Sequence, residues 1–161
     1  MKQLHRRVVV TGLGILSPIG NTVNEAWSSC TQGLSGITNV DVGITNSTVR
    51  IGAQLKNFNT LDYLDPKEVR RIDPFIQYGL IAANQSISDS GILEYESLNK
   101  EKVGINFGAG IGGIQTIENN KMILESKGHK KVSPFFVPGS IVNMISGLVS
   151  IKHGFMGPNT S

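Results

Sequence analysis

Glycine is concentrated in the stretch 103–117, VGINFGAGIGGIQTI, which constrains the fold more than any other segment. Branched and aromatic residues alternate with smaller ones over 103–107, a pattern typical of a buried strand. Four of the six residues from Gly108 to Gly113 are glycine, so a tight turn is expected after the strand. The periodic segment 114–127 predicts a helix. The sequence therefore predicts a strand–turn–helix unit with Ile111 at its corner.

The same glycines have the spacing of a dinucleotide-binding fingerprint, G-x-G-x-x-G, at Gly108, Gly110 and Gly113. That fingerprint also needs a second strand, ending about 20 residues further on in an acidic residue that holds a ribose hydroxyl. The segment 128–138, GHKKVSPFFVP, has no acidic residue and contains two prolines. This context disfavours nicotinamide or flavin binding, and we expect neither an organic cofactor nor a metal ion.

Two elements are predicted before residue 34. The apolar run 6–15, RRVVVTGLGI, predicts a strand buried on both faces. Thr22 and Glu25 have the spacing of a capping box, and the helix predicted after them ends at Gly33. Its apolar stripe consists of Val23, Ala26, Trp27 and Cys30. Because no histidine lies beside Cys30 in the sequence, we interpret this cysteine as a small buried hydrophobic residue rather than a nucleophile.

Two Asp-Pro pairs, at Asp65 and Asp73, are typical of helix starts. The first predicted helix carries three basic residues at i, i+3 and i+4, hence on one side: Lys67, Arg70 and Arg71. The second is predicted to end at Gly91, and its buried face consists of Ile76, Leu80, Ala83 and Ile87.

Three further segments have recognisable patterns. Residues 47–55 alternate apolar and polar side chains, which predicts a half-exposed strand. Two prolines around two phenylalanines predict a stiff aromatic loop over 133–138. Ser140 is predicted to cap a last helix that ends at Gly154, with a buried face of Ile141, Ile145, Leu148 and Ile151.

Composition limits the class of protein. The chain has 161 residues, a formal net charge of +3 and one cysteine. This length suits one domain, and no linker or repeat divides it, so residues 1–161 are treated as a single domain. The small positive charge does not favour a nucleic-acid partner, and the apolar stretches are too short to span a membrane. The single cysteine agrees with a reducing compartment, so we expect a soluble, cytoplasmic protein that binds neither nucleic acid nor membrane.

Four motifs, in order, resemble those of the β-ketoacyl-[acyl-carrier-protein] synthases, and most closely the type II condensing enzymes of fatty acid synthesis. They are RRVVVTGLGILSPIGN (6–21), RRIDPFIQYGLIAA (70–83), GAGIGG (108–113) and SPFFVPGSIVNM (133–144). The resemblance runs over the whole chain and implies an α/β, thiolase-like fold, of which this chain resembles the N-terminal half. In that fold, helices and sheets alternate in α-β-α-β-α layers, and the family forms homodimers.

The resemblance also implies a chemistry, a decarboxylating Claisen condensation of an acyl-thioester with malonyl-carrier protein. A cysteine thiolate takes the acyl group, and two histidines stabilise the enolate formed as carbon dioxide leaves. In the family the cysteine follows the Gly157-Pro158 pair within a few residues, so we expect it beyond Ser161, with both histidines and a supporting lysine. His129 and His153 match none of these positions and are interpreted as solvated or helix C-terminal cations. No catalytic residue is expected within the chain, which alone should be inactive.

The family's site residues can be carried over at two places. Ile111 matches the residue that gates the acyl pocket, and the resemblance implies an acyl-pocket set of Ile111, Ile114, Ile117, Phe136 and Val137. The last two match residues that reach across the dimer. The carrier-protein docking set comprises Lys67, Arg70, Arg71, Lys130 and Lys131. The alternative interpretation is that the first set is ordinary core and the second a solvated helix face.

The sequence leaves a second function open, a non-catalytic module that binds acyl carrier protein through its basic residues. A dinucleotide-binding enzyme is the third alternative considered. An isolated half of a layered fold leaves a sheet edge and apolar surface uncovered. We therefore expect the chain by itself to be marginally stable or to self-associate.

Overall fold

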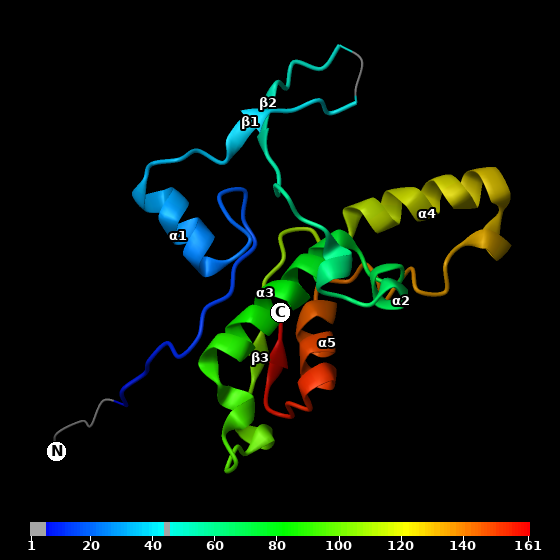
Figure 1. Ribbon diagram of the computed structural model, residues 1–161. Helices are drawn as coiled ribbons and strands as arrows, with labels where there is room; N and C mark the ends of the chain where they lie inside the picture. Colours follow the sequence, from blue (N-terminus) through cyan, green and yellow to red (C-terminus); the bar gives the residue numbers. More distant parts are fainter. Residues whose placement is uncertain (1–5, 44–45) are drawn as a thin grey trace.

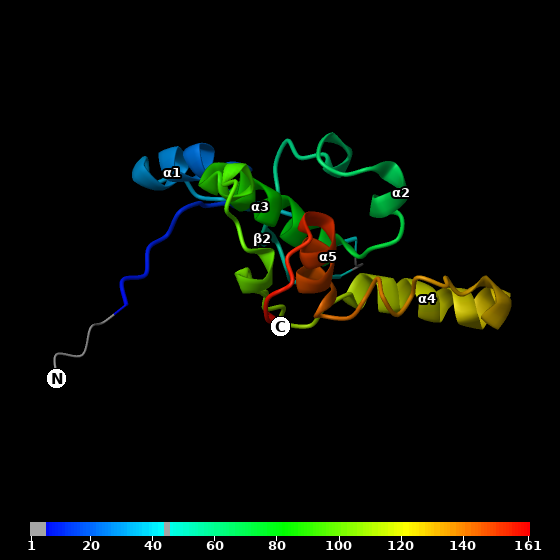
Figure 2. The ribbon, with the colours of Figure 1, turned by 90° about the horizontal axis from the view of Figure 1, so that it is seen from below.

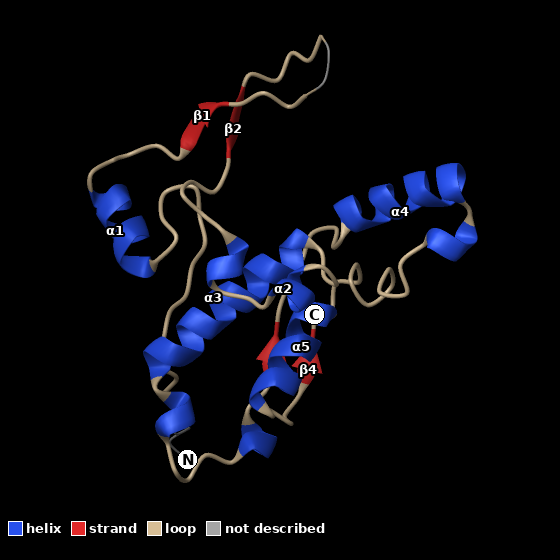
Figure 3. Ribbon diagram, turned by 45° about the vertical axis from the view of Figure 1, so that its right-hand side comes forward, coloured by secondary structure: helices blue, strands red, loops and turns tan. Residues whose placement is uncertain are grey.

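The computed structural model describes residues 6–43 and 46–161. Five helices and four short strands follow one another in these residues, joined by long loops (Figure 1). In chain order they are α1 (Val23–Thr31), β1 (Ile37–Asn39), β2 (Ile51–Ala53), α2 (Pro66–Val69), α3 (Pro74–Ser90), β3 (Ile105–Asn106), α4 (Ile114–Lys127), α5 (Met144–His153) and β4 (Asn159–Thr160). Short 3₁₀ helices are η1 (Thr60–Asp62), η2 (Ile92–Glu94), η3 (Lys100–Lys102) and η4 (His129–Lys131). Figure 3 shows how little of the chain is strand.

The core lies where α3, α5 and the parallel pair β3–β4 meet, at the centre of Figure 1. Strand β3 pairs with β4 in the register Ile105↔Asn159 and Asn106↔Thr160. Gly79 of α3 allows α5 to approach, because a Cβ there would meet the Ile145 side chain at 2.8 Å. The buried residues of this core are Leu64, Ile76, Leu80, Ile81, Ala83, Ile145 and Val149. Each large aliphatic side chain among them contributes about 1.5–3 kcal/mol when fully buried.

Helix α3 confirms the prediction made from its ends. The side chain of Asp73 accepts from the Phe75 amide, Pro74 occupies the first turn, and Gly91 ends the helix with a left-handed φ of 62°. These residues satisfy backbone groups that a helix terminus leaves unpaired. Helix α2 also begins as predicted, at Asp65, but it is a single turn that ends at Val69.

The strand predicted for residues 6–15 is wrong for this structure. The segment forms no strand, and Val8 is 90% exposed. Its later part lies along α3, where the Asp89 carboxylate accepts from the Leu13 amide and the Gln85 amide oxygen accepts from the Ile15 amide. A strand buried on both faces needs a layer on each side, and the described residues supply one layer here.

Helix α1 also differs from its prediction in burial. Its start is as expected, since the Thr22 hydroxyl accepts from the Glu25 amide and the Glu25 carboxylate accepts from the Asn21 amide. Of the predicted apolar stripe, however, only Ala26 is buried, whereas Trp27 is 68% exposed and Cys30 is exposed. The helix stands at the margin of the fold (Figure 2), so the prediction of a buried Cys30 is wrong.

The last helix ends at Gly154 as predicted but begins at Met144 rather than at Ser140. The Ser140 hydroxyl donates to the carbonyls of Phe136 and Val137 and so stabilises a turn before the helix. Ile145 is buried, whereas the predicted core positions Ile141 and Ile151 are exposed. Strand β2 is shorter than the predicted 47–55 and pairs with β1 in an exposed antiparallel hairpin.

None of the helices in the described residues is long and apolar enough to cross a membrane.

His153, the last residue of α5, contacts Asn84 within α3. Its Nε2 lies 3.1 Å from Oδ1 of Asn84, and its ring stacks on Phe155 with 5.5 Å between ring centroids. Burial, then the charge of Lys152 and that of Lys100, lower the pKa of His153 from its ordinary value of 6.5. The folded state thus favours the neutral ring, so of the two roles expected for His153 the helix C-terminal cation is disfavoured.

This geometry predicts a pH dependence of stability. The contribution of neutral His153 is complete above its unfolded pKa and is lost as the pH falls through the lower folded pKa. His153→Gln keeps a partner for Asn84 and cannot titrate, so its free energy of unfolding should fall less than the wild type's between about pH 7 and pH 5. We expect a difference below about 1 kcal/mol in chemical denaturation, since the ring is partly solvated. His129→Gln, in an exposed turn, is the control; equal pH slopes in wild type and His153→Gln would contradict the prediction.

Candidate functional site

The predicted strand–turn–helix corner is present, with β3 leading through the glycines into α4. Gly112 has a φ of +85°, and the Gly113 amide donates to the Ser140 carbonyl over 2.8 Å. A Cβ at Gly112 would lie 2.8 Å from that carbonyl oxygen, and one at Gly113 would lie 2.6 Å from the Ser140 Cα. Glycine is therefore required at both positions for the corner to pack against the 139–140 turn. Ile111, just before them, is 71% exposed.

A buried carboxylate holds the helix side of this corner. Asp73 is 4% exposed, and its two oxygens serve two different helices. Oδ1 accepts from the Phe75 amide at the start of α3, and Oδ2 accepts from the Thr116 amide in the first turn of α4 over 2.9 Å. Helix α4 begins at Ile114, and its N-cap residue, Gly113, has no side chain to cap the helix. Asp73 therefore supplies from another element the acceptor that α4 lacks.

The same contact contradicts the dinucleotide alternative. A pyrophosphate bound by such a fingerprint lies on the amides at the helix N-terminus. In this chain a carboxylate and the Ser140 carbonyl already bind the Thr116 and Gly113 amides. After α4 comes the 3₁₀ helix η4 and then a loop, where the fingerprint would require a second strand.

The residues of the predicted acyl-pocket set lie at the corner, at the start of α4 and in the turn before α5. Phe136 is half-buried, whereas Val137 is 57% exposed. Both belong to the turn that Ser140 stabilises, and this turn contacts the corner through the bond from the Gly113 amide. The exposed members of the set are Ile111, Ile114, Ile117 and Val137. We use the name apolar face for five exposed residues at the corner, on α4 and in the turn before α5, namely these four and Ile141.

The predicted carrier-docking residues fall in two separate places. Lys67, Arg70 and Arg71 lie in and just after α2, and all are exposed. The Arg70 Nε donates to the Pro66 carbonyl, and the Arg71 guanidinium lies over the Phe135 ring, 4.7 Å from its centroid. Because α2 ends at Val69, Arg70 and Arg71 both lie beyond the helix, and the prediction that all three basic residues share one side of it is wrong.

The other two basic residues, Lys130 and Lys131, lie in η4 at the far end of α4, which projects away from the core (Figure 1). A helix of 14 residues separates them from the corner, a length of about 20 Å. Within the described residues, the ion pair found is Lys121–Glu125, so none of the five predicted docking residues is neutralised by a salt bridge.

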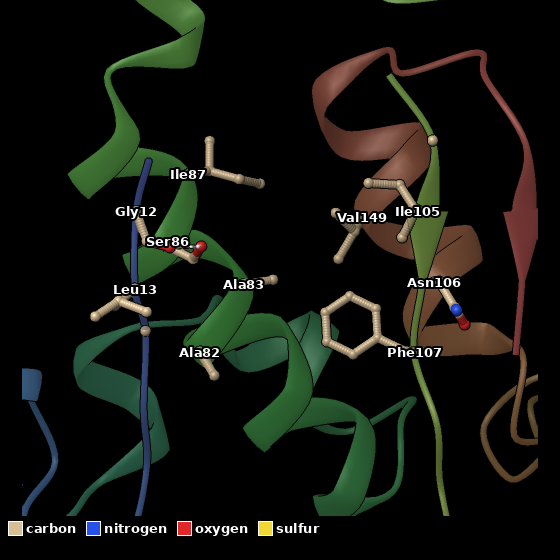
Figure 4. A pocket seen from close by; sticks show the side chains of 12 residues that line it. Gly12, Leu13, Ala82, Ala83, Ser86, Ile87, Ile105, Asn106, Phe107 and Val149 are labelled. Atoms are coloured by element: carbon tan, nitrogen blue, oxygen red, sulfur yellow. Dashed lines mark hydrogen bonds between the residues drawn. The ribbon is translucent and has the colours of Figure 1, made fainter. Parts of the chain in front are cut away.

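A groove of about 420 Å³ opens between α3, residues 12–14 and strand β3 (Figure 4). Its walls are mainly apolar, with Ile87, Phe107 and Val149 facing the space. The hydroxyl in the wall, Ser86 Oγ, donates to the Gly12 carbonyl and is not paired with any base. The groove therefore offers packing surface rather than reacting groups.

No nucleophile with a base emerges from the described residues. Cys30 is exposed on α1, and His153, at the end of α5, contacts Asn84 within α3 and Phe155. His129 lies in η4.

Comparison with known proteins decides the family. The model of the family described as "Beta-ketoacyl synthase, N-terminal domain" matches residues 5–161. The chain belongs to the β-ketoacyl synthase family. It is 48% identical over 155 residues to 3-oxoacyl-[acyl-carrier-protein] synthase 2 of Vibrio harveyi, covering 96% of this chain and 37% of that protein. The corresponding synthase 2 of Coxiella burnetii is 44% identical over 159 residues, with 97% and 38% covered. The chain thus spans less than two-fifths of the length of these β-ketoacyl synthases.

Solved structures give the fold. A type II polyketide ketosynthase, in complex with its acyl-carrier protein and bound to the hexaketide, matches with a TM-score of 0.78 and 28% identity, over 98% of this chain and 41% of that chain. The ishigamide ketosynthase/chain length factor matches with a TM-score of 0.79 at 22% identity, over 97% and 38%. The predicted α/β, thiolase-like fold class of the condensing enzymes is confirmed.

The roles of three residues that shape the site were not predicted from the sequence. Asp73 was predicted as the cap of α3 alone, and its second partner lies 43 residues away. Ser140 was predicted as a helix cap and instead stabilises a turn. Asn120, a buried residue of α4, accepts from the Ser133 amide and donates to the Thr116 carbonyl. The sequence signal available for Asn120 was a polar residue on the inner side of a helix. A buried amide side chain needs hydrogen-bond partners, so such a residue indicates contacts to other segments.

The apolar face predicts self-association of the isolated chain. Exposed apolar side chains grouped on one surface favour association. The double substitution Ile117→Lys and Val137→Lys should therefore shift the chain towards monomer in sedimentation velocity. Trp27→Lys, which changes a more exposed apolar residue on α1, is the control and should leave the distribution unchanged. A double variant that associates like the wild type, or a monomeric Trp27→Lys, would count against the apolar face.

Proposed function

We propose that this chain is the N-terminal part of a 3-oxoacyl-[acyl-carrier-protein] synthase of fatty acid biosynthesis. The observation that carries the proposal is 48% identity to such a synthase over 96% of the chain. In the proposed reaction, an acyl group held as a thioester on a cysteine is joined to the two-carbon unit of malonyl-carrier protein. Carbon dioxide leaves, the new carbon–carbon bond forms at the thioester carbonyl, and the free thiol and a 3-oxoacyl-carrier are released.

The role proposed for the acyl-pocket residues is to form one wall of the chamber that holds the acyl chain. Ile111 stands at the glycine corner with its side chain in solvent, so it can change rotamer without backbone strain. Ile114 and Ile117 continue the same surface along α4. An alkyl chain is bound by apolar area removed from water, and this surface offers that area once other walls enclose it.

The role proposed for the basic residues is to dock an acidic acyl carrier protein. Lys67, Arg70 and Arg71 are exposed and unneutralised, as a docking face for acidic side chains requires. Lys130 and Lys131 would contact the carrier at a second place, at the end of α4. One structural relative is a ketosynthase in complex with its acyl-carrier protein, which supports a carrier as partner. Charges of this kind raise the association rate and orient the partner.

A homodimer is the second part of the proposal. Phe136 and Val137 belong to the turn beside the corner, and exposed Val137 lies where a second copy could cover it. Partner residues at this turn would close the chamber that the chain alone leaves open. The cytoplasmic location expected from the sequence stays a prediction.

The second candidate function, a non-catalytic carrier-binding module, is favoured by one observation. The basic residues are available for binding, whereas the single cysteine is exposed on α1 without a base. The two candidates differ in whether the 161 residues act alone or as part of a larger enzyme. Both candidates require carrier binding, and neither forms a covalent acyl-enzyme from these 161 residues alone. Formation of an acyl-enzyme would therefore indicate an active enzyme instead.

The first test is acyl transfer to these 161 residues. Cys30 lacks a base and a helix N-terminus beside its thiol, so no acyl-enzyme should form when the chain is incubated with radiolabelled acyl-carrier protein. Label retained on denaturing gels and mapped to any residue would overturn this. Cys30→Ser should be indistinguishable from the wild type.

The second test is carrier binding. The double charge reversal Arg70→Glu and Arg71→Glu should weaken binding of an acyl carrier protein at least about tenfold, because like charges then face each other. Titration calorimetry at rising salt should show that wild-type binding weakens with ionic strength. Arg50→Glu with Lys102→Glu makes the same change in net charge elsewhere and should leave the affinity within about twofold. If both double variants bind the carrier equally weakly, net charge alone explains the loss of affinity, and the proposed docking site is contradicted.

A further inference from the structure

We propose that Asp73 is a positioning residue that fixes the Ile111 corner relative to the basic residues of the 67–71 segment. The inference rests on the proposed function for the roles of its two ends, acyl binding at the corner and carrier docking at the segment. Asp73 contacts neither partner in this scheme. It acts through hydrogen bonds to three backbone segments, the start of α3, the start of α4 and the 139–140 turn. The Ile111 corner and the 67–71 segment therefore move as one body.

The first step of the argument is the corner side. The Asp73 Oδ2 accepts from the Thr116 amide over 2.9 Å and thereby holds the first turn of α4. The Asp73 backbone amide donates to the Gly139 carbonyl over 3.0 Å. The next carbonyl, that of Ser140, accepts from the Gly113 amide. The corner is thus bound to Asp73 twice, once directly at Thr116 and once through the 139–140 turn.

The second step is the carrier side. Gln77, one turn into α3, is buried, and its Nε2 donates to the Val69 carbonyl over 3.1 Å and to the Ile72 carbonyl over 2.9 Å. These bonds hold the backbone that carries Arg70 and Arg71. A Cβ at Gly139 would lie 2.6 Å from the Arg71 carbonyl oxygen, so the 139–140 turn packs directly on this backbone. Arg71 also covers the Phe135 ring of the same loop.

The third step separates this arrangement from an ordinary helix cap. Asp65 caps α2 in the usual way, since it is exposed and accepts from the Lys67 amide alone. Asp73 is 4% exposed, and its carboxylate has no ion pair among the described residues. A buried carboxylate needs hydrogen-bond donors, and here they come from two helices that are separate in the sequence. The geometry therefore suits a joint between elements.

The test compares Asp73→Ser with Asp73→Asn. Serine can still cap α3 through its hydroxyl, but its side chain is too short to reach the Thr116 amide as well. Asparagine keeps the length of the side chain and has one acceptor oxygen for two donors. Two NMR readouts are taken on the 161-residue chain, amide exchange of Thr116 and the shift changes at residues 110–113 on addition of an acyl carrier protein.

We expect Thr116 exchange to rise about tenfold in Asp73→Ser, with Asp73→Asn intermediate and the α3 amides unchanged. Shift changes at the corner on carrier binding should be present in the wild type, smaller in Asp73→Asn and absent in Asp73→Ser. The affinity for the carrier should meanwhile change less than about threefold, since the basic side chains are kept. Asn99→Ser, which alters the cap of η3 away from the corner, should match the wild type in both readouts.

Unchanged Thr116 exchange in Asp73→Ser, or carrier-dependent shifts that persist there, would overturn the inference. If Asp73→Ser does not fold, Asp73→Asn decides the same points. If the wild-type chain binds no carrier at all, the proposed function fails, and the exchange of Thr116 still decides whether Asp73 holds α4. The two failures are therefore distinguishable.

Discussion

The rest of the site depends on one buried carboxylate shared between two helices. A helix N-terminus has amides without intrahelical partners, and α4 has no side chain of its own at this end to satisfy them. The Asp73 carboxylate accepts from the Thr116 amide of α4 and also caps α3 by accepting from the Phe75 amide. The start of α4 is therefore held beside the start of α3. The Ile111 corner, which precedes α4, owes its place to this contact and to the bond between Gly113 and Ser140.

Elements with local start and stop signals were predictable from the sequence. Helix α3 has an Asp-Pro start and a glycine at its end, and α4 follows glycines and ends before Gly128. In both, the information lies within the helix and its neighbours in sequence, so the periodicity and the caps suffice. The strand–turn–helix unit around Ile111 was predictable for the same reason.

Burial was less predictable, because it depends on which other layers are present. The apolar pattern of residues 6–15 predicts a covered strand, yet Val8 is 90% exposed. Trp27 and Cys30 on α1 and Ile151 on α5 are likewise exposed. The sequence shows that these residues are apolar but not which surface, if any, covers them. The second role of Asp73 was not predictable either, since the Thr116 amide lies 43 residues further along the chain.

Hydrogen bonds of Asp73 and Gln77 thus join the exposed apolar residues at the corner to the backbone that carries the exposed basic residues after α2. Exposed Ile114 and Ile117 of α4 provide apolar surface, and Arg70 and Arg71 after α2 provide positive charge. Lys130 and Lys131 lie beyond the end of α4, so the exposed basic residues form two separate groups rather than one continuous patch.

The shared role of Asp73 is tested most directly by the scalar coupling across its hydrogen bond with the Thr116 amide. In a chain labelled with ¹³C and ¹⁵N, the account predicts a resolved coupling between the Thr116 amide nitrogen and the Asp73 side-chain carboxyl carbon. It also predicts slow exchange of that amide. No coupling, together with Thr116 exchange as fast as that of the exposed amides in the β1–β2 hairpin, would contradict it.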